Sequence, residues 1–438
     1  RISEEPFRRV NEQIFSDMKV RASYGSLGNG NVDPYSFLEL LSIKTSDRVL
    51  NGALNKYTSA PAVMPSGLTW ETATTTDVGL DFGMLNSRFR FSGDYYIRKT
   101  TDMYTVGKTL PEIFGAASPK GNYADMTTKG WEITLTWRDH FELASKPFNY
   151  EIKGTLSDYI STIDRYNNEN KYLDDYYEGM RVGEIWGYET EGLFKDQADI
   201  DNHATQKLIK ASSKNIWYPG DVKLKDQDGN GAIDYGTNRV DDHGDLKVIG
   251  NSLPRFAYSI NLSGDWNNFF ISAFFQGVGK QDWYPSSVCI FWGQYNRPYN
   301  NLPTWHVDNY WTEDNQGAYL PRYAGYNTSI RDTKQTRYLQ NVAYIRLKNL
   351  QFGYTLPKQW ISKIMLQNAR VYISAENLWC WSPLYKHTRD LDVTNIYGSD
   401  PDLTDADMKS GLNGKRGSGD GNSYPQMRSV SLGVSVTF

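Results

Sequence analysis

The sequence predicts an all-β fold, and more specifically a transmembrane antiparallel β-barrel. Three observations lead to this prediction: apolar and polar residues alternate along many segments, the connections between those segments alternate in length, and the apolar runs are short. The sequence contains no run of about 18 apolar residues, which is what a membrane-crossing helix needs. We therefore expect strands, rather than helices, to cross the membrane.

The alternation is clearest in the segment GWEITLTW. Trp131, Ile133 and Leu135 fall on one face of this segment, whereas Glu132 and Thr134 fall on the other. Successive side chains of a β-strand point to opposite faces, so the segment forms a strand with one apolar and one polar face. About ten strands of this kind are expected, near residues 17–27, 70–84, 88–107, 127–139, 147–163, 254–267, 268–284, 341–356, 367–381 and 424–438.

The connections between these strands are alternately long and short. The long ones cover residues 28–69, 108–126, 164–253, 285–340 and 382–423. In an up-and-down meander this alternation puts every long loop at one end of the sheet. Outer-membrane barrels have this asymmetry, with short periplasmic turns and long extracellular loops, whereas a soluble sandwich has no reason to sort its loops. We therefore expect a multi-pass protein of a Gram-negative outer membrane, in contact with its lipid.

Two strands carry further information. In the final segment, Val430 and every second residue after it form an apolar face that ends on Phe438, as is typical of outer-membrane barrel proteins. In the segment NVAYIRLKNLQFGYTLP, Arg346 and Lys348 fall in phase with the apolar residues that follow them. The sequence predicts a β-bulge near Asn349 that restores the phase. The alternative is that Asn349 faces lipid near an interface.

Composition narrows the class of protein. The chain has 438 residues and a formal net charge of −4, and it has no basic footprint that would indicate a nucleic-acid partner. It contains 31 Tyr and 13 Trp, yet its mean hydropathy is −0.61, which suits aromatic belts combined with large polar loops. Cys289 and Cys380 are interpreted as two unrelated thiols rather than a disulfide. Since the sequence starts without Met or a signal peptide, we expect an upstream part to be missing.

Several segments resemble motifs of SusC/RagA-type TonB-dependent transporters. They are KVRASYGSLGN, GLTWETATTTDVGLDF, EIWGYETEGLF, PGDVKLKDQDGNGAID, VIGNSLPRFAYS, YIRLKNLQFGYTLP and ISAENLW, and they span nearly the whole chain in order. The resemblance implies that residues 1–438 form the C-terminal half of a barrel of about 22 strands, without the plug domain and the first strands. Because lipid does not tolerate unpaired strand edges, a remaining barrel segment must close the sheet.

The same resemblance implies a function and partners. It implies TonB-dependent active import of oligomeric nutrients, with glycans as the first candidate and peptides as the alternative, and no enzyme activity. A SusD-like surface lipoprotein would act as a lid, and TonB would act through the missing plug region. A passive porin and an omptin-like outer-membrane protease are the alternatives from other classes. For the protease, His243 beside Asp241 and Asp242 is the candidate, although the histidines are scattered along the chain.

The long loop at residues 164–253 contains KDQDGNGAID, which resembles half of a calcium loop. Such a loop offers oxygen ligands on alternate residues, with Gly at its sharp turn. Position 12, where a carboxylate is expected, holds Thr237, so a later Asp must complete the shell. The candidate ligands of a structural Ca²⁺ are Asp226, Asp228, Asn230, the Ala232 carbonyl, Asp234, Asp241, Asp242 and Asp245. The alternative is a metal-free turn rich in Asx and Gly.

The long loops are also rich in aromatic residues. Rings that stack on sugar faces beside hydrogen-bonding groups are typical of carbohydrate sites. The candidate substrate-binding residues are Trp186, Tyr188, Trp217, Tyr218, Trp292, Tyr295, Trp305 and Trp311. The alternative for each ring is that it packs the loops together or forms a rim on which the lid docks.

Overall fold

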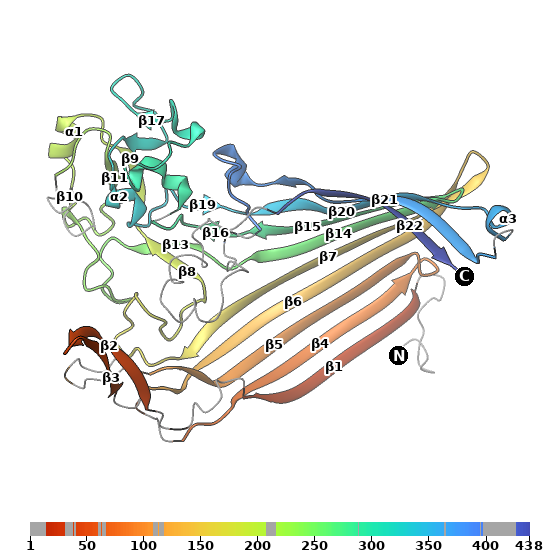
Figure 1. Cartoon of the computed structure of the whole chain (residues 1–438), viewed down its shortest axis with the longest axis horizontal. Coiled ribbons are helices and arrows are strands. Elements are labelled where there is room, and N and C mark those ends of the chain that lie inside the picture. The colour runs from red at the N-terminus through yellow and green to blue at the C-terminus, as the bar shows by residue number, and fades with distance from the viewer. Residues whose placement is uncertain are drawn as a thin grey trace.

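The structure, a computed structural model, describes residues 15–30, 41–59, 67–107, 118–206, 216–287, 289–362, 365–394 and 426–438, together with residues 38, 63, 113 and 396. Ten strands form one antiparallel sheet, and their order in space follows their order in the chain (Figure 1). They are β1 (Phe15–Asn29), β4 (Glu71–Met84), β5 (Phe89–Val106), β6 (Lys120–Leu143), β7 (Lys146–Arg165), β14 (Arg255–Trp266), β15 (Phe269–Lys280), β20 (Tyr344–Thr355), β21 (Asn368–Trp381) and β22 (Ser429–Thr437). Each overlaps a segment in which the alternation predicts a strand, which confirms the antiparallel sheet.

The sheet is open. Within the described part of the chain, β1 pairs only with β4, and β22 pairs only with β21. The ten strands therefore do not close on themselves, and both edges are left available to another segment.

The long connections lie at one end of the sheet and the short turns at the other (Figure 1). The long connections contain β2 (Ser42–Leu50), β3 (Ala53–Ser59), β8 (Glu184–Gly187), β9 (Thr190–Leu193), α1 (Gln197–Asp201), β10 (Thr205–Gln206), β11 (Val222–Leu224), β12 (Ala232–Ile233), β13 (Lys247–Asn251), β16 (Asp282–Trp283), η3 (Ile290–Tyr295), η4 (Thr304–His306), β17 (Tyr310–Trp311), β18 (Leu320–Arg322), α2 (Thr328–Arg331), β19 (Gln340–Asn341) and η6 (Pro383–Lys386). At the turn end, α3 (Lys358–Ile361) joins β20 to β21. Among the described residues, every helix falls short of the length and apolarity of a membrane span.

The sheet has one apolar and one polar face. Tyr95 of β5 pairs with Trp131 of β6 on the first face, whereas Asp94 pairs with Glu132 on the second. Many large side chains of the apolar face are exposed, among them Leu135, Ile152, Ile271, Phe352, Ile373 and Leu432. An exposed apolar surface of this extent marks contact with a membrane or a partner, in agreement with the lipid-facing surface expected from the sequence.

Aromatic rings gather on the apolar face where the strands meet the short turns. Neighbouring strands contribute the pairs Phe82–Phe91, Phe141–Phe148 and Phe269–Tyr354, with ring centroids 4.9, 5.0 and 4.7 Å apart. We name these six residues the turn-end belt. Aromatic side chains favour the boundary between hydrocarbon and water, so the belt agrees with the aromatic girdles expected of an outer-membrane barrel.

Strand β20 contains the bulge that the sequence predicts. Leu347 and Asn349 pair with two successive residues of β15, so Lys348 between them is the extra residue of a bulge. The bulge puts Arg346 on the same face as Asn349, which pairs with Glu376 of β21 on the polar face. The alternative in which Asn349 faces lipid is therefore wrong.

Three long connections share one hydrophobic core outside the sheet. Its buried residues come from residues 188–233, 283–342 and 384–396, and we name these three segments the loop module. The largest fully buried side chains include Trp283, Trp292, Tyr295, Tyr338, Phe291, Leu320 and Ile330. Cys289 lies in this core and Cys380 lies on β21, and the two form no disulfide. This agrees with their interpretation as unrelated thiols.

Candidate functional site

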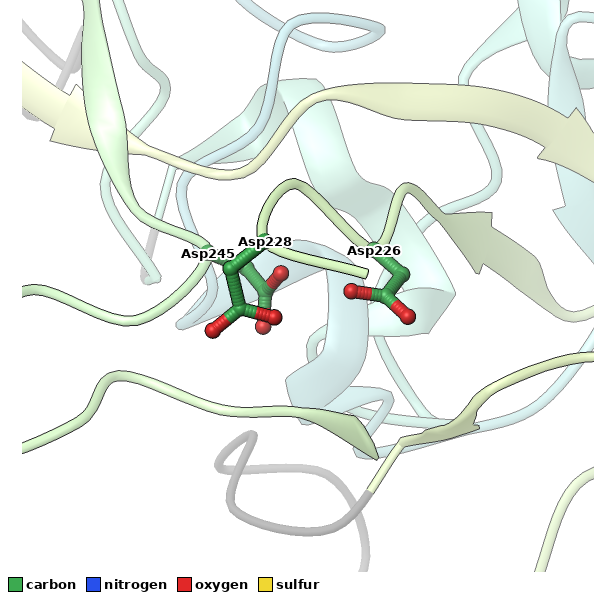
Figure 2. A group of neighbouring side chains, drawn as sticks. All are labelled: Asp226, Asp228 and Asp245. Carbon is green, nitrogen blue, oxygen red and sulfur yellow. The ribbon is translucent and has the colours of Figure 1, made fainter. Parts of the chain in front are cut away.

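Three acidic side chains converge between β11 and β13. Asp226 and Asp228 lie in the turn that follows β11, and Asp245 comes from the residues just before β13 (Figure 2). One carboxylate oxygen of each residue lies within 4.8 Å of those of the other two. Oxygen atoms from carboxylates are the ligands that calcium prefers, so this group fits one divalent cation.

Asp245 is the buried member of the group. The residue is 0 % exposed, and its two oxygens accept backbone N–H groups from Gln227 at 2.6 Å and from Asp234 at 2.9 Å. Burial raises the pKa of Asp245 above its usual range, and the charges of Asp228 and Asp226 raise it further. A buried carboxylate that faces two others is unfavourable unless a cation or a proton neutralises it.

The acidic group includes one of the three Asp residues that the sequence offers in place of Thr237. Asp241 instead forms an ion pair with Arg239 at 2.8 Å. Asp242 accepts the backbone N–H of Thr237 at 3.2 Å. The structure therefore brings Asp245, and neither Asp241 nor Asp242, to Asp226 and Asp228.

The remaining predicted ligands hold the turn itself together. Asn230 Oδ1 accepts the backbone N–H of Ala232 at 2.8 Å, and the Asn230 amide donates to Asp228 at 2.9 Å. Asp234 Oδ1 accepts the backbone N–H of Gly236 at 2.8 Å. These short-range contacts are those of an Asx-rich turn, so the metal-free alternative also has structural support.

The acidic turn is anchored in the loop module on both sides. Leu224 in β11 and Ile233 in β12 are fully buried. The side chain of Gln206 holds β11 in place, since its amide donates to the carbonyl oxygen of Val222 at 3.1 Å and its carbonyl accepts the backbone N–H of Leu224 at 2.7 Å. A cation at this turn would therefore stiffen the module.

The nearby lysines are engaged by Glu189. Lys247 forms an ion pair with Glu189, and Lys225 lies 3.6 Å from the same carboxylate. The hydrogen bonds from Lys247 and Gln227 lower the pKa of Glu189 to about 2. These two cations consequently do not neutralise the acidic group.

Half of the predicted substrate-binding rings are buried. They are Tyr188, Trp292, Tyr295 and Trp311. Trp292 and Tyr295 are 0 % exposed; the Trp292 indole donates to the carbonyl of Pro285 at 3.2 Å and the Tyr295 hydroxyl to that of Pro321 at 2.7 Å. For these rings the structure favours the packing alternative over contact with substrate.

The other four rings are at least partly exposed: Trp186, Trp217, Tyr218 and Trp305. Tyr218 is the most accessible, at 49 %. The guanidinium of Arg322 lies 4.5 Å from the Tyr218 ring centroid and is itself held by an ion pair with Asp221 at 2.6 Å. Burial raises the pKa of Asp221, and the ion pair with Arg322 opposes that rise. Tyr218 is thus a fixed ring with exposed surface, as a stacking platform requires.

Two exposed tyrosines escaped the sequence analysis. Tyr299 is 73 % and Tyr326 is 55 % exposed. Their segments touch, because a Cβ on Gly325 would lie 2.3 Å from Cγ of Pro298. Tyr299 lies in the segment NRPYNN, whose turn-forming residues signal an exposed loop.

Two hollows of about 550 Å³ each lie near the turn end of the sheet. The first is bordered by the charged residues Asp17, Lys19, Asp81, Arg90 and Lys153, and the second by Arg88, Arg138, Asp139, Glu151 and Asp265. Charges of both signs suit the docking of a protein segment better than an ion-selective pore.

Comparison with known proteins finds similarity to TonB-dependent receptors along nearly the whole chain. No family model matches it. It is 28 % identical over 451 residues to TonB-dependent receptor P3 of Formosa agariphila, covering 96 % of this chain and 39 % of that receptor. It is 24 % identical over 448 residues to TonB-dependent receptor SusC of Bacteroides thetaiotaomicron, covering 100 % of this chain and 39 % of SusC. The chain thus spans about two fifths of the length of these relatives.

The fold is similar to that of a solved importer. The RagAB peptide importer in its open-open state matches with a TM-score of 0.66 and 18 % identity, over 99 % of this chain and 41 % of that chain. Its closed-closed state matches with a TM-score of 0.64 and 20 % identity, over 87 % of this chain and 39 % of that chain. These similar proteins are named as receptors and an importer rather than as enzymes. From strand alternation to whole-chain similarity, the observations agree that the chain is SusC/RagA-like and shares the β-barrel fold of TonB-dependent transporters.

Proposed function

We propose that the chain is part of a TonB-dependent importer that moves oligomeric nutrients across the outer membrane of a Gram-negative bacterium. The observation that carries this proposal is the match of the whole chain to TonB-dependent receptors. The two-faced sheet, the turn-end belt and the sorting of long loops to one end support a membrane barrel as its setting.

Three further parts are proposed around this sheet. Another barrel segment pairs with the free edges of β1 and β22, because each unsatisfied backbone group in lipid costs several kcal/mol. A plug docks against the charged hollows near the turn end and couples to TonB. A SusD-like lipoprotein covers the loop end, where Tyr218, Tyr299 and Tyr326 offer exposed rings for contact.

Oligosaccharides are the first proposed substrates and peptides the second. Exposed tyrosine rings such as Tyr218 and Tyr299 suit stacking on sugar faces, which supports glycans. The similarity of the fold to an importer named for peptides supports the alternative. Substrates of both classes would pass through the same barrel, so the loop end and the lid must select between them.

Uptake by cells tests the proposal. A strain without the gene is complemented with the full-length protein, and labelled oligosaccharide and peptide pools are followed into cells with TonB present or deleted. We expect one pool to enter, and its entry to be lost without TonB. Entry that persists without TonB would indicate a passive porin, and cleavage of peptides by the purified protein would indicate a protease.

We also propose that Asp226, Asp228 and Asp245 hold a structural calcium ion. The proximity of the three carboxylates and the burial of Asp245 support this assignment. The ion would neutralise the group and tie the turn after β11 to the residues before β13. Asp241 is excluded from the proposed shell because it pairs with Arg239.

Calorimetric titration of calcium into chelator-treated full-length protein tests the site. We expect binding at one site in the wild type, its loss in Asp245→Asn and its retention in Asp241→Asn. The matched variants remove the same charge, so equal losses would indicate diffuse attraction to an acidic surface. No binding heat in the wild type, with calcium-insensitive thermal unfolding, would establish the metal-free turn.

A further inference from the structure

A hollow of about 420 Å³ lies on the apolar face of the sheet, beside the turn-end belt. It crosses β7, β14 and β15, which are neighbours in the sheet (Figure 1). The apolar-face residues that line it are Phe141, Phe148, Tyr150, Ile152, Leu262, Gly264, Ile271 and Ala273. Glu151 and Ser263 also border it, but the alternation along their strands places their side chains on the polar face.

Gly264 forms the floor of this hollow. On the apolar face it lies between Tyr150 of β7 and Ile271 of β15, so the missing side chain leaves a gap between two large ones. A Cβ at Gly264 would lie 2.9 Å from Cζ of Phe148, which shows that the Phe148 ring leans over the gap. Ala273 keeps the adjoining position shallow. The hollow is thus a groove with small residues below and large ones around it.

The walls of the groove are held in place. The Trp137 indole donates to the hydroxyl of Tyr150 at 3.2 Å, and the Phe148 ring stacks on Phe141 of the turn-end belt. On the far side of the belt, the Trp266 indole donates to the carbonyl oxygen of Leu143 at 2.9 Å. A groove that is formed before its ligand arrives loses less entropy on binding.

The chemistry of the groove selects its occupant. Its apolar-face lining offers a water molecule few hydrogen-bond partners, so an ordered water is disfavoured there. A hydrocarbon chain, by contrast, gains dispersion contacts with every wall. The groove is continuous with the exposed apolar surface of Ile152 and Ile271, and on a transmembrane barrel that surface contacts lipid.

We propose that this groove binds one acyl chain of a bilayer lipid, with the lipid headgroup at the level of the turn-end belt. The proposal rests on the membrane location given under the proposed function, and it adds a defined lipid site to an otherwise general lipid-facing surface. The acyl chain runs along Gly264, between Leu262 and Ile271 and beneath the Phe148 ring.

Native mass spectrometry of the full-length protein tests the proposal. The protein is taken from phospholipid nanodiscs into detergent, and the fraction that retains one phospholipid is measured. Ala273→Leu fills the groove, and we expect retention to fall about tenfold, the loss that corresponds to roughly two methylene groups leaving their contacts. Ala22→Leu makes the same change on the apolar face of β1, outside the groove, and should retain lipid like the wild type.

A second variant distinguishes loss of the groove from misfolding caused by added bulk. Phe148→Ala removes the covering ring without adding bulk, and it should also weaken retention. Equal retention in Ala273→Leu, Phe148→Ala and Ala22→Leu, all inserted in membranes, overturns the groove proposal alone. Failure of the wild-type protein to enter bilayers in a flotation assay overturns the proposed membrane location instead.

Discussion

Acidification should open the loop module, because His306 is buried there as a neutral ring. The residue is 0 % exposed. Its Nε2 donates to the carbonyl oxygen of Phe291 at 2.9 Å, since a carbonyl can only accept, and its Nδ1 has no hydrogen-bond partner. The rings of Trp305 and Tyr295 lie 4.3 and 5.7 Å away. A proton added to this ring would be a buried charge among aromatic neighbours.

The magnitude follows from the pKa of His306. Burial lowers that pKa from 6.5 to about 4, and the hydrogen bond to Phe291 only partly opposes the effect. The opened module, in which the ring is solvated, binds more protons between these two values, so the free energy of opening falls as the pH falls through them. At pH 4 the loss is about 3 kcal/mol, or roughly a hundredfold in the opening equilibrium.

The buried thiol of Cys289 reports on this opening. Cys289 belongs to the same core, and Cys380→Ser leaves it as the sole thiol of the chain. Labelling with a disulfide reagent that reacts in acid is followed at pH 7 and pH 4, with His306 or with His306→Gln. The glutamine amide keeps a donor for Phe291 but does not titrate. From pH 7 to pH 4, the labelling rate of the protein with His306 should rise about a hundredfold more than that of the protein with His306→Gln.

Other groups also titrate in this range, so the difference between the two backgrounds is the measured quantity. His140→Gln, at the exposed turn end, should leave the acceleration unchanged. Equal acceleration with His306 and with His306→Gln would refute the reasoning, because the acid sensitivity would then come from other groups.

Three further changes probe the loop module and the sheet. Trp292→Ala should lower the free energy of opening by about 3–5 kcal/mol through the cavity it leaves, while the exposed Tyr299→Ala changes it by less than about 0.5 kcal/mol; thiol labelling of the core measures both. Arg346 and Asp392 form an ion pair, and each side chain is 6 % exposed. Arg346→Met leaves the buried Asp392 without its partner, so it should lower the free energy of unfolding by about 3–5 kcal/mol, and Asp392→Leu in the same protein should recover part of that loss. The temperature of the gel-mobility shift measures both changes. Deletion of Lys348 removes the extra residue of the bulge, while Leu347 and Asn349 keep the faces on which they pair with β15; we expect a folded band on a heat-modifiability gel, and loss of that band would contradict the bulge.

The sheet could be predicted because its one apolar and one polar face impose alternation on the sequence. The phase break at Arg346 was informative for the same reason, since a charge on the apolar face of a membrane barrel is too costly to be accidental. Strand β6 runs from Lys120 to Leu143, beyond the predicted 127–139. Towards the loop end both faces are polar or covered by loops, so alternation no longer marks the strand.

The acidic group could be predicted only in part. Asp241, Asp242 and Asp245 have the same chemistry and similar positions in the sequence, and backbone geometry decides among them. Asp245 donates its backbone N–H to the carbonyl oxygen of Asp234 at 3.0 Å, and Gly236 and Gly244 both adopt positive φ. The residues between Asp234 and Asp245 thus form a closed loop that returns the chain beside the calcium-like turn, and no residue pattern in the sequence predicts this closure.

The aromatic residues were ambiguous for a related reason. Trp292 and Tyr218 both lie in long connections between strands, yet one is fully buried and the other half exposed. Burial of Trp292 depends on three connections meeting, and the separate segments carry no sign that they meet.

The shared core of the loop module also dictates an order of assembly. Thr190 donates its hydroxyl to Gln335, 145 positions later in the chain, and the ring of His387 stacks on that of Tyr319 with centroids 4.4 Å apart. Contacts at such separations are entropically costly until the strands fix both ends of each connection. We therefore expect the module to form after β7, β14, β15, β20 and β21 have joined the sheet. A barrel that stalls before β21 would carry its aromatic-rich connections unpacked and open to proteases, so survival of the loops reports that the wall has been completed.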